Sequence, residues 1–249
     1  MAGKTILITG ASTGIGAATA VMAGQQGWQV AINYRDNDEA AEAVAQTIRD
    51  AGGEARLVQG DVSDPAAVES VFAAVDAAFG PLDVLVNNVG VVGPKASVEE
   101  LSAERIERIF RTNVLSAFLC AGAAVRRMAN RHGGKGGAIV NVSSVAAKHG
   151  APHEYVDYAA TKGAMDSFTV GLAKELADQG VRVNSVRPGI IDTAIHAKGG
   201  QPDRVAKMSH VVPMSRAGTA EEIAEAILWV ASDKASYMTG GFLDVSGGR

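Results

Sequence analysis

Short runs of β-branched and aliphatic residues recur along the chain, and alanine-rich stretches with a helical period separate them. Seven runs are expected to be strands, and these are Thr5–Thr9, Gln29–Asn33, Ala55–Gln59, Val84–Asn87, Ala138–Val142, Arg182–Arg187 and Gly241–Val245. Amphipathic helices are expected between them, among others at Asp38–Asp50, Pro65–Phe79 and Ala220–Ala231. This alternation predicts an α/β fold, a doubly wound parallel sheet of about seven strands flanked by helices on both faces.

No linker or change of composition divides the chain, so residues 1–249 are expected to form a single domain. The longest stretch without a helical or strand period is 193–218, which contains Gly199-Gly200 and two prolines. A loop of that length inside a compact domain is usually functional, and we expect it to be a substrate lid. The alternative is a plain surface excursion.

Composition and charge narrow the classes of function. Hydrophobic residues make up 47% and charged residues 20% of the chain, and its formal net charge is -4 with the basic residues scattered. We therefore expect no nucleic-acid partner and no membrane partner. No run approaches the roughly 20 apolar residues that span a bilayer, and Thr5–Thr9 is too short for the core of a signal peptide. Cys120 is the only cysteine, so we expect a reducing compartment, the cytoplasm.

A glycine-rich loop follows the first expected strand and opens a helix. It reads T-G-A-S-T-G-I-G, and its candidate ligand-binding residues are Gly10, Ser12, Thr13, Gly14, Ile15 and Gly16. Glycines let the backbone approach a pyrophosphate, and the free N–H groups of a helix N-terminus bind it. In its strand–loop–helix context the pattern indicates a Rossmann-type dinucleotide site, whereas the alternative is a structural turn.

The end of the second expected strand reads Asn33-Tyr34-Arg35, where an acidic residue would select the free ribose of NAD(H). The Arg35 guanidinium suits a ribose phosphate instead, so NADP(H) is favoured and NAD(H) stays possible. In the alternative, Arg35 is simply solvated and Asp36 or Asp38 holds the ribose.

Two further strand ends are expected at the same crevice. Asp61-Val62 follows the third strand, and Asp61 could accept a hydrogen bond from an adenine amino group or act as an ordinary helix cap. Asn87-Asn88-Val89-Gly90 ends the fourth strand, beside the first strand of a doubly wound sheet. Asn88 and Gly90 are therefore candidate cofactor contacts.

Tyr158 and Lys162 lie four residues apart on an expected helix and so share one face. A lysine ammonium beside a tyrosine favours the phenolate and is expected to lower the pKa of Tyr158 toward the working range. A hydroxyl from Ser143 or Ser144, after the fifth strand, could hold the substrate oxygen. The four-residue spacing alone is a short motif that also occurs by chance.

Taken together, these motifs give the chain its resemblance to the short-chain dehydrogenase/reductase family, in its compact single-domain form. The matching segments occur in the family's order: Thr9–Gly16, Asp61-Val62, Asn87–Gly90, Asn113, Ser144, Tyr158-x-x-x-Lys162, Pro188-Gly189-x-x-x-Thr193, and Thr239-Gly240 with Val245-x-Gly247-Gly248. They cover nearly the whole chain. The sequence is similar to glucose 1-dehydrogenase-like and 3-oxoacyl carrier-protein reductase-like members.

The resemblance implies a role for each matching residue. Tyr158 would be the general acid/base, Ser144 would position the substrate oxygen, and Lys162 would bind the nicotinamide ribose. Asn113 would hold a water that extends the proton relay. The nicotinamide carboxamide would be held by the segment that contains Pro188, Gly189, Ile191 and Thr193. The resemblance further implies a homotetramer.

Two positions depart from the family pattern. Val89 stands where alanine is usual, so packing against the cofactor is expected to differ. Ser144 lies 14 residues before Tyr158 rather than the usual 13, so Ser143 remains a candidate for the same role. We favour Ser144, because the family uses the second serine of N-x-S-S.

The expected function is therefore hydride transfer between a nicotinamide cofactor and a small carbonyl or secondary-alcohol substrate. His153, Glu154 and Tyr155, together with the lid, would shape the substrate pocket. No metal site is expected, because Gly150 to Pro152 make a helix between His149 and His153 improbable. A non-catalytic regulator that senses dinucleotides is the alternative. An enoyl reductase of this fold would place its tyrosine and lysine further apart.

Overall fold

A parallel sheet of seven strands forms the centre of the molecule in the computed structural model, which describes residues 3–249 without the side chains of His196 and Lys198. The strands are β1 (Thr5–Ile8), β2 (Gln29–Tyr34), β3 (Glu54–Gln59), β4 (Val84–Asn87), β5 (Gly137–Val142), β6 (Val181–Pro188) and β7 (Phe242–Val245). Their order is β3-β2-β1-β4-β5-β6-β7, and every neighbouring pair is parallel. The predicted fold class is confirmed.

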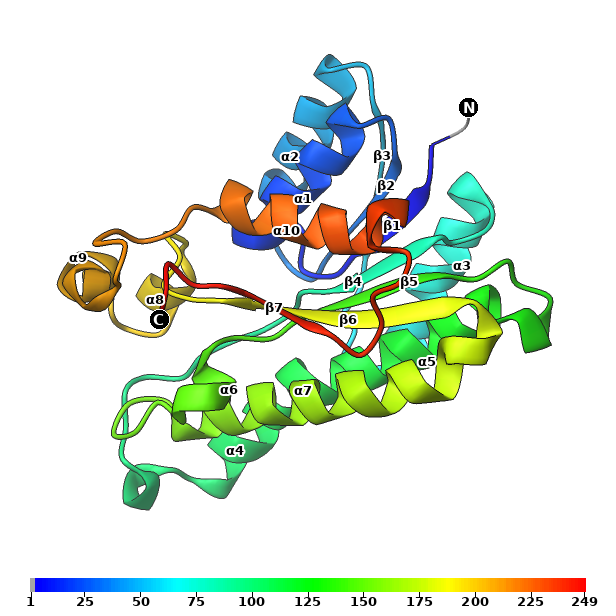
Figure 1. Cartoon of the computed structure of the whole chain (residues 1–249). Coiled ribbons are helices and arrows are strands. Elements are labelled where there is room, and N and C mark those ends of the chain that lie inside the picture. The colour runs from blue at the N-terminus through cyan, green and yellow to red at the C-terminus, as the bar shows by residue number, and fades with distance from the viewer. Residues whose placement is uncertain (1–2) are drawn as a thin grey trace.

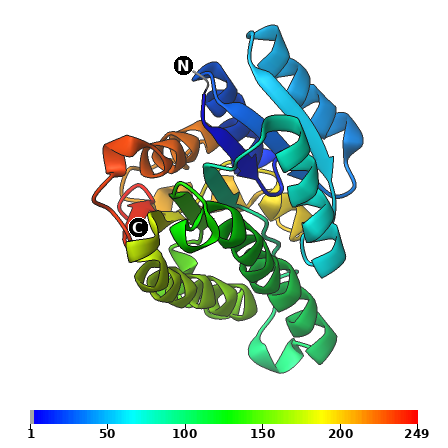
Figure 2. The same ribbon diagram turned by 90° about the vertical axis from the view of Figure 1, so that its right-hand side faces the viewer.

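Helices cover both faces of this sheet (Figures 1 and 2). The helices are α1 (Gly14–Gln25), α2 (Asp38–Asp50), α3 (Pro65–Phe79), α4 (Ala103–Phe110), α5 (Ser116–Met128), α6 (Ala146–His149), α7 (Val156–Leu176), α8 (Ile195–Lys198), α9 (Arg204–Met208) and α10 (Ala220–Ala231). One hydrophobic core joins the sheet to α1, α2 and α10, and a second joins its other face to α3, α5 and α7. Burial on both faces explains why most strands are apolar almost throughout.

Local sequence signals begin these helices where the chain turns back onto the sheet. Asp64 accepts a hydrogen bond from the backbone N–H of Ala66, and Pro65 is the first residue of α3. Thr219 and Glu222 form a reciprocal capping box at the start of α10, with N···O distances of 3.2 and 2.8 Å. Among the described residues, no helix is both long enough and apolar enough to cross a membrane.

The strand order creates a crevice at the carboxyl ends of β1 and β4. The chain leaves β1 for α1 on one face of the sheet, whereas after β4 it runs to α4 and α5 on the other face (Figure 1). Because the two connections diverge, the sheet edge between them stays open to a ligand.

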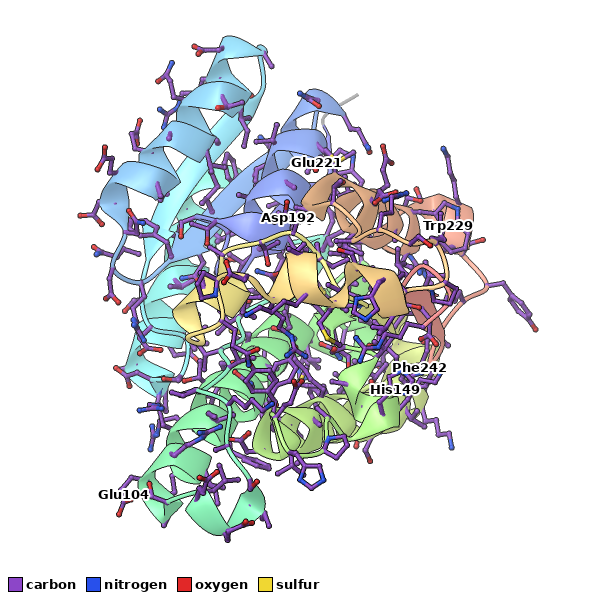
Figure 3. The ribbon with its side chains drawn as sticks, turned by 90° about the vertical axis from the view of Figure 1, so that its left-hand side faces the viewer. Glu104, His149, Asp192, Glu221, Trp229 and Phe242 are labelled. Atoms are coloured by element: carbon purple, nitrogen blue, oxygen red, sulfur yellow. The ribbon has the colours of Figure 1, made fainter. Side chains whose placement is uncertain are left out.

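The segment 193–218 contains more regular structure than its composition predicts. Two short helices, α8 and α9, and a 3₁₀ turn at Ser209–Val211 lie within it. Its two ends are pinned together, because Ile191 pairs with Gly218 and the N–H of Asp192 donates to the Gly218 carbonyl at 2.9 Å. The segment is therefore a closed excursion that crosses the carboxyl edge of the sheet below α10 (Figure 3).

Backbone strain is concentrated in the loop between α6 and α7. Ala151 and His153 have φ values of 43° and 59°, in the left-handed region that side chains with a Cβ disfavour. Gly150, with φ of 73°, precedes them. Non-glycine residues persist in such conformations where the surrounding structure holds them.

Replacing Ala151 with glycine is expected to leave the free energy of unfolding unchanged or to raise it. Relief of left-handed strain, roughly 1–2 kcal/mol, offsets the greater entropy of a glycine in the unfolded chain. The control Ala43→Gly, at an exposed position inside α2, should lower stability by about 1 kcal/mol. Chemical unfolding measures the free energy of unfolding of both variants. An equal loss of stability in the two would contradict the strain at Ala151.

Candidate active site

The glycine-rich loop takes the shape that a bound pyrophosphate requires. Gly10 and Gly14 have φ values of 63° and 59°, and Thr13, the first residue before α1, makes no side-chain cap. A Cβ on Gly16 would lie 2.6 Å from the Gly10 carbonyl oxygen, so only glycine permits this close approach of helix and loop. The loop thus leaves the first N–H groups of α1 free of side-chain caps, where they can bind an anion.

Two predicted cofactor residues, Asn33 and Asn88, hold the loop in place. The amide nitrogen of Asn33 donates to the carbonyls of Val58 and Gly60, and its oxygen accepts from the Gly10 N–H. Asn33 is buried, so its side chain supports the loop from the protein interior. Asn88 likewise donates to the carbonyls of Thr9 and Gly10, at 2.9 and 3.1 Å.

Arg35 lies at the exposed end of β2, where the ribose is expected. Its Nε is 2.5 Å from Asp36, and its Nη1 is 3.8 Å from Asp61. Asp61 accepts hydrogen bonds from the N–H and hydroxyl of Ser63, while Asp64 caps α3. The cap alternative for Asp61 is therefore wrong, and Asp61 lies at the same strand edge as Arg35.

The segment after β6 reaches across to the glycine-rich loop. The Gly189 N–H donates to the Val245 carbonyl at 3.0 Å, and a Cβ on Gly189 would lie 2.7 Å from the Cα of Ser246. Beyond it, the methyl group of Thr193 lies 3.5 Å from the position that a Cβ on Gly14 would occupy. The structure thus brings together the predicted pyrophosphate and nicotinamide segments.

Lys162 is buried between α7 and the ends of β4 and β5. Its Nζ donates to the Val142 carbonyl at 2.8 Å and lies 5.5 Å from the centroid of the Tyr158 ring. A Cβ on Gly90 would be 3.4 Å from this Nζ, so the glycine keeps the space open. Burial lowers the pKa of Lys162 to about 8, and the nearby Asp166 carboxylate opposes part of that decrease.

The two serines after β5 have different roles. The Ser143 hydroxyl donates to the backbone carbonyl of Lys162 at 3.1 Å and thereby anchors α7. The Ser144 side chain lies beside the Tyr158 hydroxyl, where it lowers the pKa of the phenol, and its oxygen accepts from the Ala146 N–H at 3.1 Å. Ser144, the serine favoured from the sequence, is therefore the one beside the tyrosine.

Burial raises the pKa of Tyr158 to about 12, and Ser144 opposes only part of this increase. The expected lowering of the Tyr158 pKa by Lys162 is thus not found in the protein without its cofactor. Loss of hydration is the largest influence on the pKa of the phenol, and burial also disfavours the charged form of Lys162. The neutral phenol is the resting form near pH 7.

Asn113 lies in a π-helical turn, Arg111–Leu115, that joins α4 to α5. Its amide oxygen accepts from the Val91 N–H at 2.8 Å, and its nitrogen donates to the Val91 carbonyl and the Thr161 hydroxyl. Asn113 therefore ties the loop after β4 to α7, the helix that carries Tyr158. Such π-helical turns are frequent at functional sites.

Sequence reasoning missed the ion pairs that surround this centre. Arg105 on α4 binds the buried Asp157 at 2.8 Å, and Arg204 on α9 binds Glu154 at 2.7 Å. The partners are about 50 residues apart, so no local pattern reveals them. His149 and His153, in contrast, are both exposed, and within the described residues no three metal-binding side chains gather. Figure 3 shows His149 at the molecular surface.

Comparisons with known proteins agree with this geometry. A sequence model of the family described as enoyl-(acyl carrier protein) reductase matches residues 10–249. The chain is 54% identical over 243 residues to the uncharacterized oxidoreductase YgfF of Escherichia coli, covering 98% of each chain. It is 38% identical over 247 residues to an L-rhamnose 1-dehydrogenase (NAD(P)(+)) of a Sphingomonas strain, covering 99% of this chain and 96% of the relative.

The fold also matches a solved structure. A short-chain type dehydrogenase/reductase from Mycobacterium marinum superimposes with a TM-score of 0.92 at 36% identity, covering 99% of this chain and 95% of that one. The relatives named here are an oxidoreductase and dehydrogenases, which gives no support to a sensing regulator. The chain is an oxidoreductase that belongs to the short-chain dehydrogenase/reductase family.

Proposed function

We propose that this enzyme reduces a ketone or aldehyde with NADPH, or oxidises the matching secondary alcohol, with Tyr158 as the general acid/base. The observation that carries the proposal is the proximity of both Ser144 and Lys162 to Tyr158. Ser144 lies beside the Tyr158 hydroxyl, and the Lys162 Nζ is 5.5 Å from the centroid of its ring. Ser144 would hold the substrate oxygen, and Asn113 would extend the proton relay from Lys162.

The residues present fit a nicotinamide dinucleotide. The close approach at Gly16 and the uncapped start of α1 suit its pyrophosphate, and Lys162 would bind the nicotinamide ribose. When bound, the cofactor supplies the hydride that is transferred to the carbonyl carbon. The Tyr158 hydroxyl gives its proton to the carbonyl oxygen, and Ser144 stabilises the charge that develops there. A neutral phenol at pH 7 suits this donor role.

Replacing Tyr158 with phenylalanine is expected to abolish turnover, at least about 1,000-fold in kcat, because the proposed proton donor to the substrate oxygen is lost. Affinity for NADPH, measured by fluorescence titration, should change by less than about 3-fold, since the hydroxyl faces the substrate. A panel of ketones, aldehydes and secondary alcohols, run with both cofactors, first identifies a substrate for the wild type.

Tyr237→Phe is the matched control, because Tyr237 is fully exposed and far along the chain from this site. Its turnover should equal that of the wild type. Retention of more than a tenth of wild-type kcat in Tyr158→Phe would refute the role of Tyr158.

The preference for NADP(H) rests on Arg35, the cation at the end of β2, and on the absence of a carboxylate at positions 33 to 35. Replacing Arg35 with aspartate is expected to lower the ratio of kcat/KM for NADPH over NADH by at least about 10-fold, because the guanidinium contact to the 2′-phosphate becomes a repulsion. Arg56→Asp, at an exposed position on β3, controls for the change in net charge. An unaltered ratio in Arg35→Asp would mean that another residue selects the cofactor.

Lys162 generates a pH-dependent contribution to stability. Its folded pKa of about 8 lies below the ordinary value of 10.5, so between these pH values the unfolded chain holds more protons than the folded one. The stability of the wild type relative to Lys162→Met should therefore rise as the pH increases from 8 to 10.5, by at most on the order of 3 kcal/mol. Urea unfolding at several pH values measures the difference in the free energy of unfolding between the two proteins. A difference that does not change with pH would contradict the buried ammonium group.

The remaining parts of the proposal concern the surroundings of the site. Residues 193–218 would act as the substrate lid, and His153, Glu154 and Tyr155 would form the facing wall of the pocket. The single domain would assemble as a homotetramer in the cytoplasm, with a small molecule as its substrate.

A further inference from the structure

Three segments meet at Glu154, the residue four positions before Tyr158. The Glu154 carboxylate binds Arg204 of α9 at 2.7 Å and lies 3.8 Å from the ammonium group of Lys95, in the loop after β4. Its backbone carbonyl accepts a hydrogen bond from the N–H of Ala96 at 3.1 Å. One residue thus joins the segment 193–218, the loop after β4 and the loop that leads into α7.

We propose that Glu154 is a positioning residue that fastens the segment 193–218 over the catalytic centre through Arg204. The proposal rests on the proposed function in taking this segment as the lid that encloses the substrate. It adds the residue that holds the lid closed and the interaction that must break for the lid to open.

Arg204 is unusually buried for an arginine, with 8% of its surface exposed. Its guanidinium lies over the ring of Tyr155, 5.0 Å from the centroid, and Nη1 donates to the Gln201 oxygen at 3.4 Å. Among the described residues, Glu154 is the one carboxylate within ion-pair distance of it. Removing that partner would leave a cation without compensation in a largely dry environment, which is strongly unfavourable while the lid stays closed.

The contacts of the lid show why loss of this ion pair would release the segment. The ends of the lid are pinned at Ile191–Asp192 and Gly218. Among the described side chains and backbone groups of residues 195–210, the hydrogen bonds and ion pairs that leave the segment 193–218 all end on Tyr155 and Glu154. They are the bond from the Gln201 amide to the Tyr155 hydroxyl and the Arg204–Glu154 pair. Residues 195–210 therefore have their polar attachments at Glu154 and Tyr155, whereas the part of the lid that follows is held by the Met214 N–H, which donates to the Gly247 carbonyl at 3.1 Å.

The same attachment point sits on the strained loop before α7. Ala151 and His153 are held in left-handed conformations just before Glu154, and Tyr155 directly precedes α7. Contacts from the lid therefore fall on the short stretch that sets the start of the helix carrying Tyr158. Because only the closed lid encloses the substrate, a smaller closed fraction weakens apparent substrate affinity by the same factor.

Hydrogen exchange followed by mass spectrometry tests the proposal on the full-length enzyme, with and without NADPH. Glu154→Gln keeps the shape of the side chain and removes its charge. The amides of residues 199–210 should exchange at least about 10-fold faster than in the wild type, because the unpaired Arg204 favours the open lid. Asp203→Asn is the matched control, since the Asp203–Lys207 pair lies within the lid and is exposed; its exchange should match that of the wild type.

A second comparison separates a specific pair from a general disturbance of the loop. If Glu154 and Arg204 act as a unit, the double variant Glu154→Gln/Arg204→Met should open the lid no further than the single variants do. Additive effects, or wild-type protection in Glu154→Gln, would overturn the proposal.

Kinetics adds a readout of function. In Glu154→Gln the KM for the carbonyl substrate should rise about 10-fold while the Kd for NADPH stays within about 2-fold of the wild type. An unchanged KM would overturn the link to the substrate. The exchange measurement needs no substrate. If Glu154→Gln exchanges faster while the wild type turns over no substrate, the role of Glu154 in holding the segment is supported and only the proposed function is refuted.

Discussion

The divergence of the chain at the carboxyl ends of β1 and β4 is the constraint on which the whole site depends. The strand order sends the two connections to opposite faces of the sheet and leaves a crevice between them. Asn88 closes the floor of this crevice through its hydrogen bonds to Thr9 and Gly10. The glycine-rich loop, the end of β5 and the segment after β6 all converge on the same edge, so the predicted cofactor and substrate residues share one opening.

At that edge, burial affects the pKa values of the ionisable groups more than neighbouring charges do. Tyr158 and Lys162 are close together, yet loss of hydration raises the pKa of the phenol and lowers that of the ammonium group. Each group is thereby moved toward its neutral form. The phenol that results is protonated at neutral pH. The bond from Lys162 to the Val142 carbonyl and the anchoring of α7 by Ser143 keep the two groups at a fixed separation.

Sequence patterns predicted the sheet closely, because buried parallel strands leave a continuous apolar signal. Each expected strand lies within one residue of its observed bounds at both ends, and α2, α3 and α10 have the expected bounds. The four-residue spacing also placed Tyr158 and Lys162 correctly on one helix. The internal structure of the segment 193–218 was missed, since α8 and α9 are too short to show a period.

Properties that arise only in the folded structure could not be predicted from the sequence. The loss of hydration at Tyr158, which reverses the expected direction of its pKa shift, arises only in the folded chain. Asn33 looked like a cofactor contact, whereas its hydrogen bonds are used inside the protein. The Glu154–Arg204 pair joins two segments that lie 50 residues apart in the sequence.

The division of roles between Ser143 and Ser144 gives the most direct test of the central claim, that Ser144 and Tyr158 together act on the substrate oxygen. Stopped-flow absorbance follows the oxidation of bound NADPH in a single turnover with a carbonyl substrate of the wild type. Ser144→Ala is expected to slow this step at least about 100-fold, in line with loss of an oxyanion donor, while Ser143→Ala should slow it by less than about 10-fold. A larger loss in Ser143→Ala than in Ser144→Ala would contradict the central claim.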